Sequence, residues 1–82
     1  MRVLYFAWLR ERVGQAEEEV APEGVTTVAE LIAWLRARSP GHAAAFAEVP
    51  LVRCAVNQEF AHPDSAVAPG DEIAFFPPVT GG

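Results

Sequence analysis

Apolar positions follow two different spacings along this chain, and the change of spacing divides it into strands and helices. Residues 2–9 form an aromatic and β-branched run that predicts a strand, and residues 17–20 indicate a second, more polar strand. Because Gly14 ends the segment between them, we expect the two strands to form a hairpin. Residues 51–57 and 72–76 predict two further strands.

A helical spacing begins at Thr27. Thr27 and Glu30 fit a capping box, in which the hydroxyl and the carboxylate satisfy each other's free backbone N–H groups. The apolar residues that follow are spaced three and four apart, as in a helix that packs one face on a core; they are Val28, Leu31, Ile32 and Leu35. Residues 39–41 predict the end of this helix, and the alanine-rich residues 42–48 indicate a short second one.

This order of elements predicts an α+β fold in which a mixed sheet is covered on one face by a helix. The first and last strands are expected in the interior of the sheet, an arrangement known as the β-grasp, or ubiquitin-like, fold. Ferredoxin-like and other small α+β folds remain open at this point. A chain of 82 residues bounds one domain, which we place at residues 1–76, followed by an extended, flexible tail at residues 77–82.

Alternation along the strands sorts side chains between the covered and the open face of the sheet. The set expected to face the helix is Val3, Tyr5, Ala7, Ile73 and Phe75. The outward set on the first strand is Arg2, Leu4 and Phe6. Phe76 then points outward, and Phe60 follows a predicted turn at residues 57–58, so Phe6, Phe60 and Phe76 are expected to form one apolar docking patch. A register slip of one residue would bury them instead.

The net charge of the chain indicates which classes of molecule it could bind. The chain has an acidic excess of five, and all six of its positive residues are arginine. Without a basic cluster, we expect neither nucleic acid nor a membrane as partner, and a basic protein surface is favoured. One cysteine cannot make an internal disulfide. The sequence contains no signal peptide and no apolar run of membrane length, so we expect a cytoplasmic protein.

Reactive side chains within the body are few. Cys54 alternates with apolar neighbours, so we expect a buried, inert thiol. His42 and His62 are isolated and lack metal-ligand spacing, so both are expected to be solvated, and no metal site is predicted. The acidic runs at residues 17–19 and 71–72 are likewise expected to be solvated, whereas Trp34 lies off the helical stripe and should pack at the margin of the core.

The last six residues, Pro77-Pro78-Val79-Thr80-Gly81-Gly82, carry the candidate chemistry. Two prolines favour an extended backbone that leaves the body in one direction, and an extended stretch of six residues spans about 20 Å. Two glycines without side chains would let a narrow site close around the backbone. The expected reactive group is therefore the carboxylate of Gly82; the alternative is an ordinary frayed terminus.

Several segments of the sequence resemble one family, the small, sulfur-carrying subunit of molybdopterin synthase. They are residues 56–58 (VNQ), residues 69–82 (PGDEIAFFPPVTGG), residues 3–7 (VLYFA) and residues 10–11 (RE). The resemblance extends over essentially the whole chain. It implies a β-grasp protein with no active site of its own and no permanently bound cofactor.

The resemblance also implies a sequence of partners. An adenylyltransferase similar to the ubiquitin-activating enzyme would adenylate Gly82 with ATP, and sulfur would then replace one oxygen. The thiocarboxylate would enter the large synthase subunit, in a heterotetramer of two small and two large subunits. There it would donate sulfur to a cyclic pyranopterin monophosphate, and two transfers would build the dithiolene that binds molybdenum. In the family, positions matching Phe6, Phe60 and Phe76 form the apolar face that meets both partners.

Three other functions remain open from the sequence. A sulfur carrier for thiamine or for tRNA thiolation would also end in two glycines on a β-grasp body. A ubiquitin-like modifier would use the same adenylate to attach to lysines of other proteins; the absence of lysine here forbids chains through its own side chains but not conjugation. A plain β-grasp interaction module would not need a free Gly82 at all.

Overall fold

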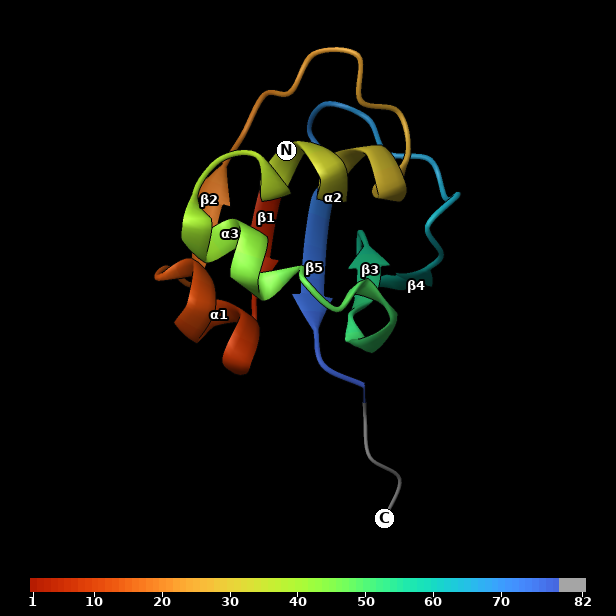
Figure 1. The fold of residues 1–82 in the computed structure, drawn as a ribbon. Coiled ribbons are helices and arrows are strands. Elements are labelled where there is room, and N and C mark those ends of the chain that lie inside the picture. The colour runs from red at the N-terminus through yellow and green to blue at the C-terminus, as the bar shows by residue number, and fades with distance from the viewer. Residues whose placement is uncertain (79–82) are drawn as a thin grey trace.

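A computed structural model describes residues 1–78 of the chain, so the predictions for Val79, Thr80, Gly81 and Gly82 lie outside the described residues. Figure 1 shows the arrangement of the elements. In chain order they are β1 (Arg2–Tyr5), α1 (Trp8–Val13), β2 (Glu17–Glu19), α2 (Val28–Arg36), α3 (Pro40–Ala45), the 3₁₀ turn η1 (Val49–Leu51), β3 (Arg53–Val56), β4 (Glu59–Ala61) and β5 (Glu72–Phe76).

The strands form one five-stranded sheet in the order β2-β1-β5-β3-β4. β1 and β5 run parallel in its centre, and the remaining pairs are antiparallel. The helices lie over one face of this mixed sheet (Figure 1). The predicted α+β, β-grasp fold is confirmed, including the interior position of the first and last strands. Within residues 1–78, no helix has the length and apolar character needed to span a membrane.

The capping box at the start of α2 forms as predicted. The backbone N–H of Glu30 donates to Thr27 Oγ1 at 3.2 Å, and the backbone N–H of Thr27 donates to Glu30 Oε1 at 3.1 Å. Two further N–H groups of the first turn, those of Val28 and Ala29, donate to backbone carbonyls of residues 65 and 63. A helix begins with N–H groups that have no intrahelical acceptor, so these bonds fasten the loop after β4 to α2.

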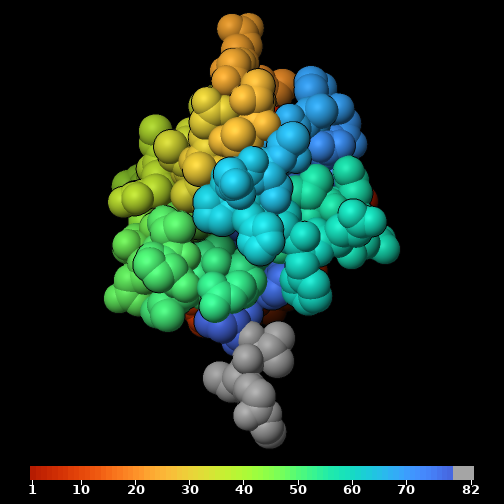
Figure 2. All heavy atoms as spheres, turned by 90° about the vertical axis from the view of Figure 1, so that its right-hand side faces the viewer, coloured from red at the N-terminus to blue at the C-terminus, as the bar shows by residue number. Residues whose placement is uncertain are grey.

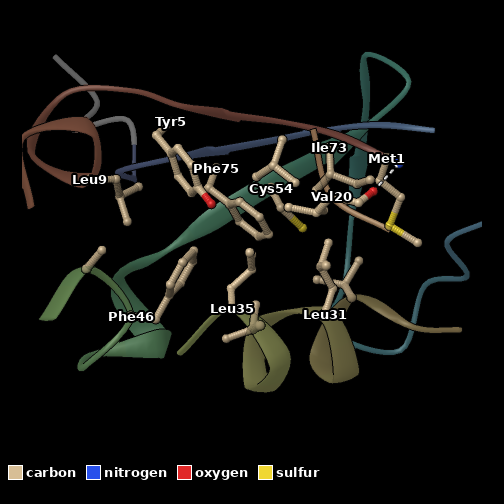
Figure 3. Close-up of a cluster of buried hydrophobic side chains, with 14 of the residues drawn as sticks. Met1, Tyr5, Leu9, Val20, Leu31, Leu35, Phe46, Cys54, Ile73 and Phe75 are labelled. Atoms are coloured by element: carbon tan, nitrogen blue, oxygen red, sulfur yellow. Dashed lines mark hydrogen bonds between the residues drawn. The ribbon is translucent and has the colours of Figure 1, made fainter. Parts of the chain in front are cut away.

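The core lies between the sheet and the helices (Figure 3). Its largest fully buried side chains come from elements far apart in the sequence: Val3, Tyr5, Leu9, Val28, Leu31, Leu35, Phe46, Ile73 and Phe75. Phe46 packs edge-on against Phe75, with ring centroids 5.0 Å apart. Burying each large apolar side chain contributes about 1.5–3 kcal/mol, so the inward halves of β1 and β5 hold the sheet to the helices.

The first strand is shorter than predicted. It ends at Tyr5, and Trp8–Val13 form α1 instead of continuing the hairpin. Leu9 donates its N–H to the carbonyl of Phe6, and Ala7 between them has φ 54° and ψ −131°, a conformation that favours glycine. The tight turn places Leu9 in the core and leaves Ala7 exposed, so the expected inward position of Ala7 was wrong. Burial of Leu9 outweighs the β propensity of the aromatic run.

Residues 51–61 also differ from the prediction. Leu51 belongs to η1 and is 46% exposed, so β3 begins two residues later than expected. Asn57 and Gln58 turn the chain as predicted, both at positive φ, and lead directly into β4, which was not predicted. A three-residue strand carries too little alternation to be recognised from sequence alone.

His42 and Glu18 are not solvated, contrary to the prediction. His42 is 4% exposed, and the side chain of Glu18 is 7% exposed. One carboxylate oxygen of Glu18, Oε2, accepts from the Tyr5 hydroxyl at 2.7 Å and lies 2.6 Å from His42 Nε2. The other, Oε1, lies 3.1 Å from a guanidinium nitrogen of Arg38. Ser39 Oγ lies 2.7 Å from His42 Nδ1 and completes the buried polar network, which fastens α3 to β1 and β2.

Candidate docking face and tail root

The tail begins at the centre of the sheet. β5 ends at Phe76, between β1 and β3, and Pro77 and Pro78 follow. Proline has no N–H to donate, so the ladder between neighbouring strands cannot continue past Phe76. The ladder of β5 therefore ends on the lower side of the view in Figure 1, where the last described residues follow it.

The open face of the sheet has small apolar side chains at its centre. The registers pair Leu4 with Ala74, Ala74 with Ala55 and Ala55 with Phe60, so these four residues form one row across β1, β5, β3 and β4. Leu4, Ala55 and Ala74 are half-buried, although none of the helices within residues 1–78 covers this face. Two alanines leave the centre of the row flat, so another protein surface could approach the strands closely.

Three phenylalanines lie around this row. Phe60 is 85% exposed, and its ring centroid lies 6.1 Å from that of Phe76, which is half-buried. Phe6 is 48% exposed and immediately follows β1; its N–H donates to the carbonyl of Phe75 on the neighbouring β5. We call the set Leu4, Phe6, Ala55, Phe60, Ala74 and Phe76 the docking face. Its rings lie toward the root of the tail, and contiguous exposed apolar area of this kind is typical of an interaction surface.

The predicted trio is therefore placed as follows. The structure brings Phe60 and Phe76 together, and it leaves Phe6 exposed just after β1, the strand beside β5. Sequence reasoning missed Ala55 and Ala74, because small residues give no signal of their own. Alternation along β3 and β5, once their registers are known, would have identified both as outward positions.

The β3–β4 hairpin that carries Phe60 is held by polar bonds. Asn57 Oδ1 accepts from the N–H of Glu72 at 3.0 Å, and Asn57 Nδ2 donates to Asp71 Oδ1 at 3.1 Å. The other oxygen of Asp71 accepts from the N–H of Ala68 at 2.8 Å. Hydrogen bonds from Asn57 and from the Ala68 backbone hold the pKa of Asp71 below its usual range. The turn is thereby fixed to β5, which gives the exposed ring a defined position.

The one cysteine behaves as the sequence predicted. Cys54 is buried on the helix side of β3, and burial raises the pKa of its thiol. A protonated thiol is a poor nucleophile, so Cys54 is unsuited to carry sulfur itself. Trp34, as expected, is partly buried and packs at the margin of the core.

Comparisons with known proteins agree over the full length of the chain. A sequence profile of the ThiS family matches residues 3–82. A protein from Escherichia coli (strain K12) named molybdopterin synthase sulfur carrier subunit is 44% identical over 82 residues, which cover 100% of this chain and 99% of that protein. A Haemophilus influenzae protein of the same name is 39% identical over 82 residues, with the same coverage.

Solved structures share the fold. Small archaeal modifier protein 1 from Haloferax volcanii has a TM-score of 0.76 and 30% identity, and the match covers 96% of this chain and 97% of that one. A complex of subunits 1 and 2 of molybdopterin-converting factor from Helicobacter pylori has a chain with a TM-score of 0.64 and 19% identity, covering 99% of this chain and 96% of that one. At that identity the second match carries the fold alone.

Proposed function

The chain belongs to the ThiS family, and from this premise we propose that it is a sulfur carrier, the small subunit of molybdopterin synthase. The observation that carries the proposal is the whole-length identity of 44% to a protein named as that subunit. The sequence of the last six residues and the apolar docking face beside their root support it.

The reactive group in this proposal is the carboxylate of Gly82. A terminal carboxylate has a pKa of about 3.5, so at neutral pH it is an anion and a poor electrophile. An adenylyltransferase would let this carboxylate attack the α-phosphorus of ATP, releasing pyrophosphate and forming an acyl adenylate. Sulfur at the oxidation level of sulfide would then attack the acyl carbon and expel AMP, leaving a thiocarboxylate. ATP is consumed by the partner enzyme and is not a resident cofactor of this chain.

In this proposal the tail contributes its length and, at its last two residues, a small cross-section. Extended, residues 77–82 would span about 20 Å, enough to enter the active site of another protein while the body stays outside. Val79 and Thr80 link the prolines to Gly81 and Gly82, and the missing side chains of the two glycines would let a tunnel close tightly around them.

The large synthase subunit is the proposed recipient. A partner is required because a thiocarboxylate exposed to water would hydrolyse, so the transfer needs a site that excludes solvent. The name shared by the E. coli and H. influenzae relatives describes a subunit, which supports a partner for this chain too. In the proposal, the large subunit binds the docking face, receives the tail and supplies the catalytic groups, in a heterotetramer. Two sulfur transfers to a cyclic pyranopterin monophosphate then form the dithiolene.

A ubiquitin-like modifier is the second candidate function. It is favoured by one observation, the 30% identity over nearly the full chain to small archaeal modifier protein 1. The two functions share the acyl adenylate and differ in the nucleophile, which is sulfur for a carrier and a lysine amine for a modifier. A modifier would end in covalent conjugates, whereas a carrier would be recovered unchanged after delivery.

A reconstituted assay tests the proposal. The thiocarboxylated chain is mixed with the large subunit and cyclic pyranopterin monophosphate, and formation of molybdopterin is measured. We expect product in proportion to the thiocarboxylate added, and none from a chain that lacks Gly82 but has an unchanged circular dichroism spectrum. Equal product from the shortened chain would overturn the role of Gly82, and conjugates in place of product would favour the modifier.

A further inference from the structure

A groove lies on the covered side of the sheet, beside the β4 edge, and the proposed function does not yet use it. It has a volume of about 810 Å³ and runs between α2, η1 and the β3–β4 hairpin. Its walls are mainly apolar and include Val28, Ile32, Val49 and Ala61, with Cys54 among its lining residues. Figure 2 faces this side: the surface is hollowed between the green and cyan segments, and the blue end of β5 shows below the hollow.

The walls of the groove are held in place by hydrogen bonds. The loop after β4 closes one end, because the N–H groups of Val28 and Ala29 donate to the carbonyls of Ser65 and Pro63 at 3.0 and 2.8 Å. On another wall, the η1 turn is closed by its own bond from the N–H of Leu51 to the carbonyl of Glu48 at 2.9 Å, and Arg53 of β3 donates to the carbonyl of Pro50 within it. The groove is therefore preformed, as most binding sites are, and an occupant would not have to order its walls.

The groove is continuous with the docking face. Phe60 and Phe76 line the groove and also belong to the docking face, so one apolar surface wraps around the β4 edge. Pro78, the last described residue, lines the groove as well. A protein that covers the docking face and takes in the tail up to its root must therefore lie against the mouth of this groove.

Arg53 gives the mouth a positive charge. It pairs in register with Phe76, lines the groove, and donates from Nη1 to the carbonyl of Pro50 at 3.1 Å. The ion pairs found among residues 1–78 are Arg2–Glu17, Arg38–Glu18 and His42–Glu18. Arg53 takes part in none of these, so its guanidinium can still accept a carboxylate from a partner.

We propose that the groove receives a protruding apolar segment of the large synthase subunit, with an acidic residue of that segment against Arg53. This inference rests on the proposed function and extends it. Contacts on one flat face leave a bound protein some freedom to rotate, whereas a second contact around the β4 edge fixes its orientation. The groove segment would thus aim the tail at the active site of the large subunit.

Isoleucine methyl groups provide a direct test on the unmodified chain. The chain has two isoleucines: Ile32 lines the groove, whereas Ile73 is fully buried and is not among the residues that line it. With both δ1 methyl groups labelled, we expect the Ile32 signal to shift on addition of the purified large subunit and the Ile73 signal to change much less. Binding that leaves the Ile32 signal in place would overturn the inference.

Other occupants give different results in the same experiment. If the chain's own end fills the groove, deletion of residues 79–82 shifts the Ile32 signal before any partner is added. If a second copy fills it, the Ile32 signal depends on the concentration of the chain alone. Either result would contradict the assignment of the groove to the large subunit.

A matched pair of variants on η1 separates the groove from the docking face. Val49 is half-buried and lines the groove, whereas Leu51 on the same turn is exposed and does not line it. We expect Val49→Asp to weaken binding of the large subunit at least about tenfold and Leu51→Asp less than about twofold, with melting temperatures measured for both. Equal effects would contradict a groove contact. Loss of binding with Phe76→Asp but not with Val49→Asp would remove the groove inference and leave the proposed function standing.

Discussion

Each face of the sheet carries a few side chains that depart from the usual distribution of polar and apolar groups. The open face exposes Phe6 and Phe60, while the covered side buries the carboxylate of Glu18 beside His42. The buried polar atoms are satisfied: within residues 1–78, no buried side-chain nitrogen or oxygen lacks a hydrogen-bond partner. Nothing among the described residues covers the exposed rings of Phe6 and Phe60 in the same way. The buried polar network therefore stabilises the fold, whereas the exposed rings are typical of a surface that binds another protein.

Adjacent residues on β5 give the strongest contrast between the two faces. Phe75 is fully buried against Phe46, whereas Phe76 is half-buried on the open face. We expect Phe75→Ala to lower the free energy of unfolding by about 3–5 kcal/mol, because it leaves a cavity in the core. Phe76→Ala should cost about 1–2 kcal/mol, in line with its smaller buried area. Urea denaturation of both variants measures this; equal losses would mean that both rings are core.

Binding should show the opposite order on the same strand. A carboxylate at position 76 would be desolvated under the large subunit without a partner, so Phe76→Asp is expected to weaken association by at least about 2 kcal/mol, the size of an interface hot spot. Its effect on unfolding should be clearly smaller. Isothermal titration calorimetry on the folded variant measures the first quantity and denaturation the second. A matched loss of both would show that the outward orientation assigned to Phe76 is wrong.

The buried polar network around Glu18 and His42 should affect the stability of the fold but not the binding of the large subunit. His42→Ala removes a partner of the buried Glu18 carboxylate and leaves that oxygen less satisfied, which should lower the free energy of unfolding by about 1–3 kcal/mol. The exposed His62, changed to alanine, is the matched control and should have almost no effect. If His42→Ala leaves the free energy of unfolding unchanged, the network does not stabilise the fold.

The same network predicts a dependence of stability on pH. Burial raises the pKa of Glu18, but hydrogen bonds from His42 and Tyr5 and the charges of His42 and Arg38 outweigh burial and hold this pKa below its ordinary value of 4.5. A lowered folded pKa means that the stabilisation is present above the unfolded pKa and is lost as pH falls through the folded one. Glu18→Gln should therefore flatten the fall of stability below about pH 4.5. Identical pH profiles would refute this.

The smallest change in the free energy of unfolding is expected at the turn between β1 and α1. Ala7 lies between the exposed Phe6 and the core residues of α1, at φ 54° and ψ −131°. A non-glycine residue in this region costs about 1–3 kcal/mol, so Ala7→Gly should raise the free energy of unfolding by about 1 kcal/mol after the entropic penalty of glycine. Ala29→Gly on the exposed face of α2 should instead destabilise. A destabilised Ala7→Gly would mean that the turn is not strained.

Features that depend on neighbouring residues could be predicted from the sequence, whereas contacts between residues far apart in the sequence could not. The capping box and β5 were predicted with their correct starting residues, because caps and β-branched or aromatic runs act over a few positions. The buried pair of Glu18 and His42 was missed, since its members are 24 positions apart and each looks like an ordinary surface residue. α1 was missed because packing of Leu9 into the core overrode local strand propensity.

The site shows the same division. Phe6, Phe60 and Phe76 could be proposed from alternation and from a resemblance, because exposed rings contradict the polar pattern of a surface. The flat row of Ala55 and Ala74 and the groove beside β4 come from strand registers and from the packing of α2 over the sheet. No spacing in the sequence indicates such features.

The most direct test of the account is the intact mass of the chain after incubation with its adenylyltransferase, ATP and a sulfur source. We predict a gain equal to the exchange of one oxygen for one sulfur, and no gain when Gly82 is deleted. An unchanged mass, with partners shown to be active on a known carrier, would contradict the central claim that this chain carries sulfur on its terminal glycine.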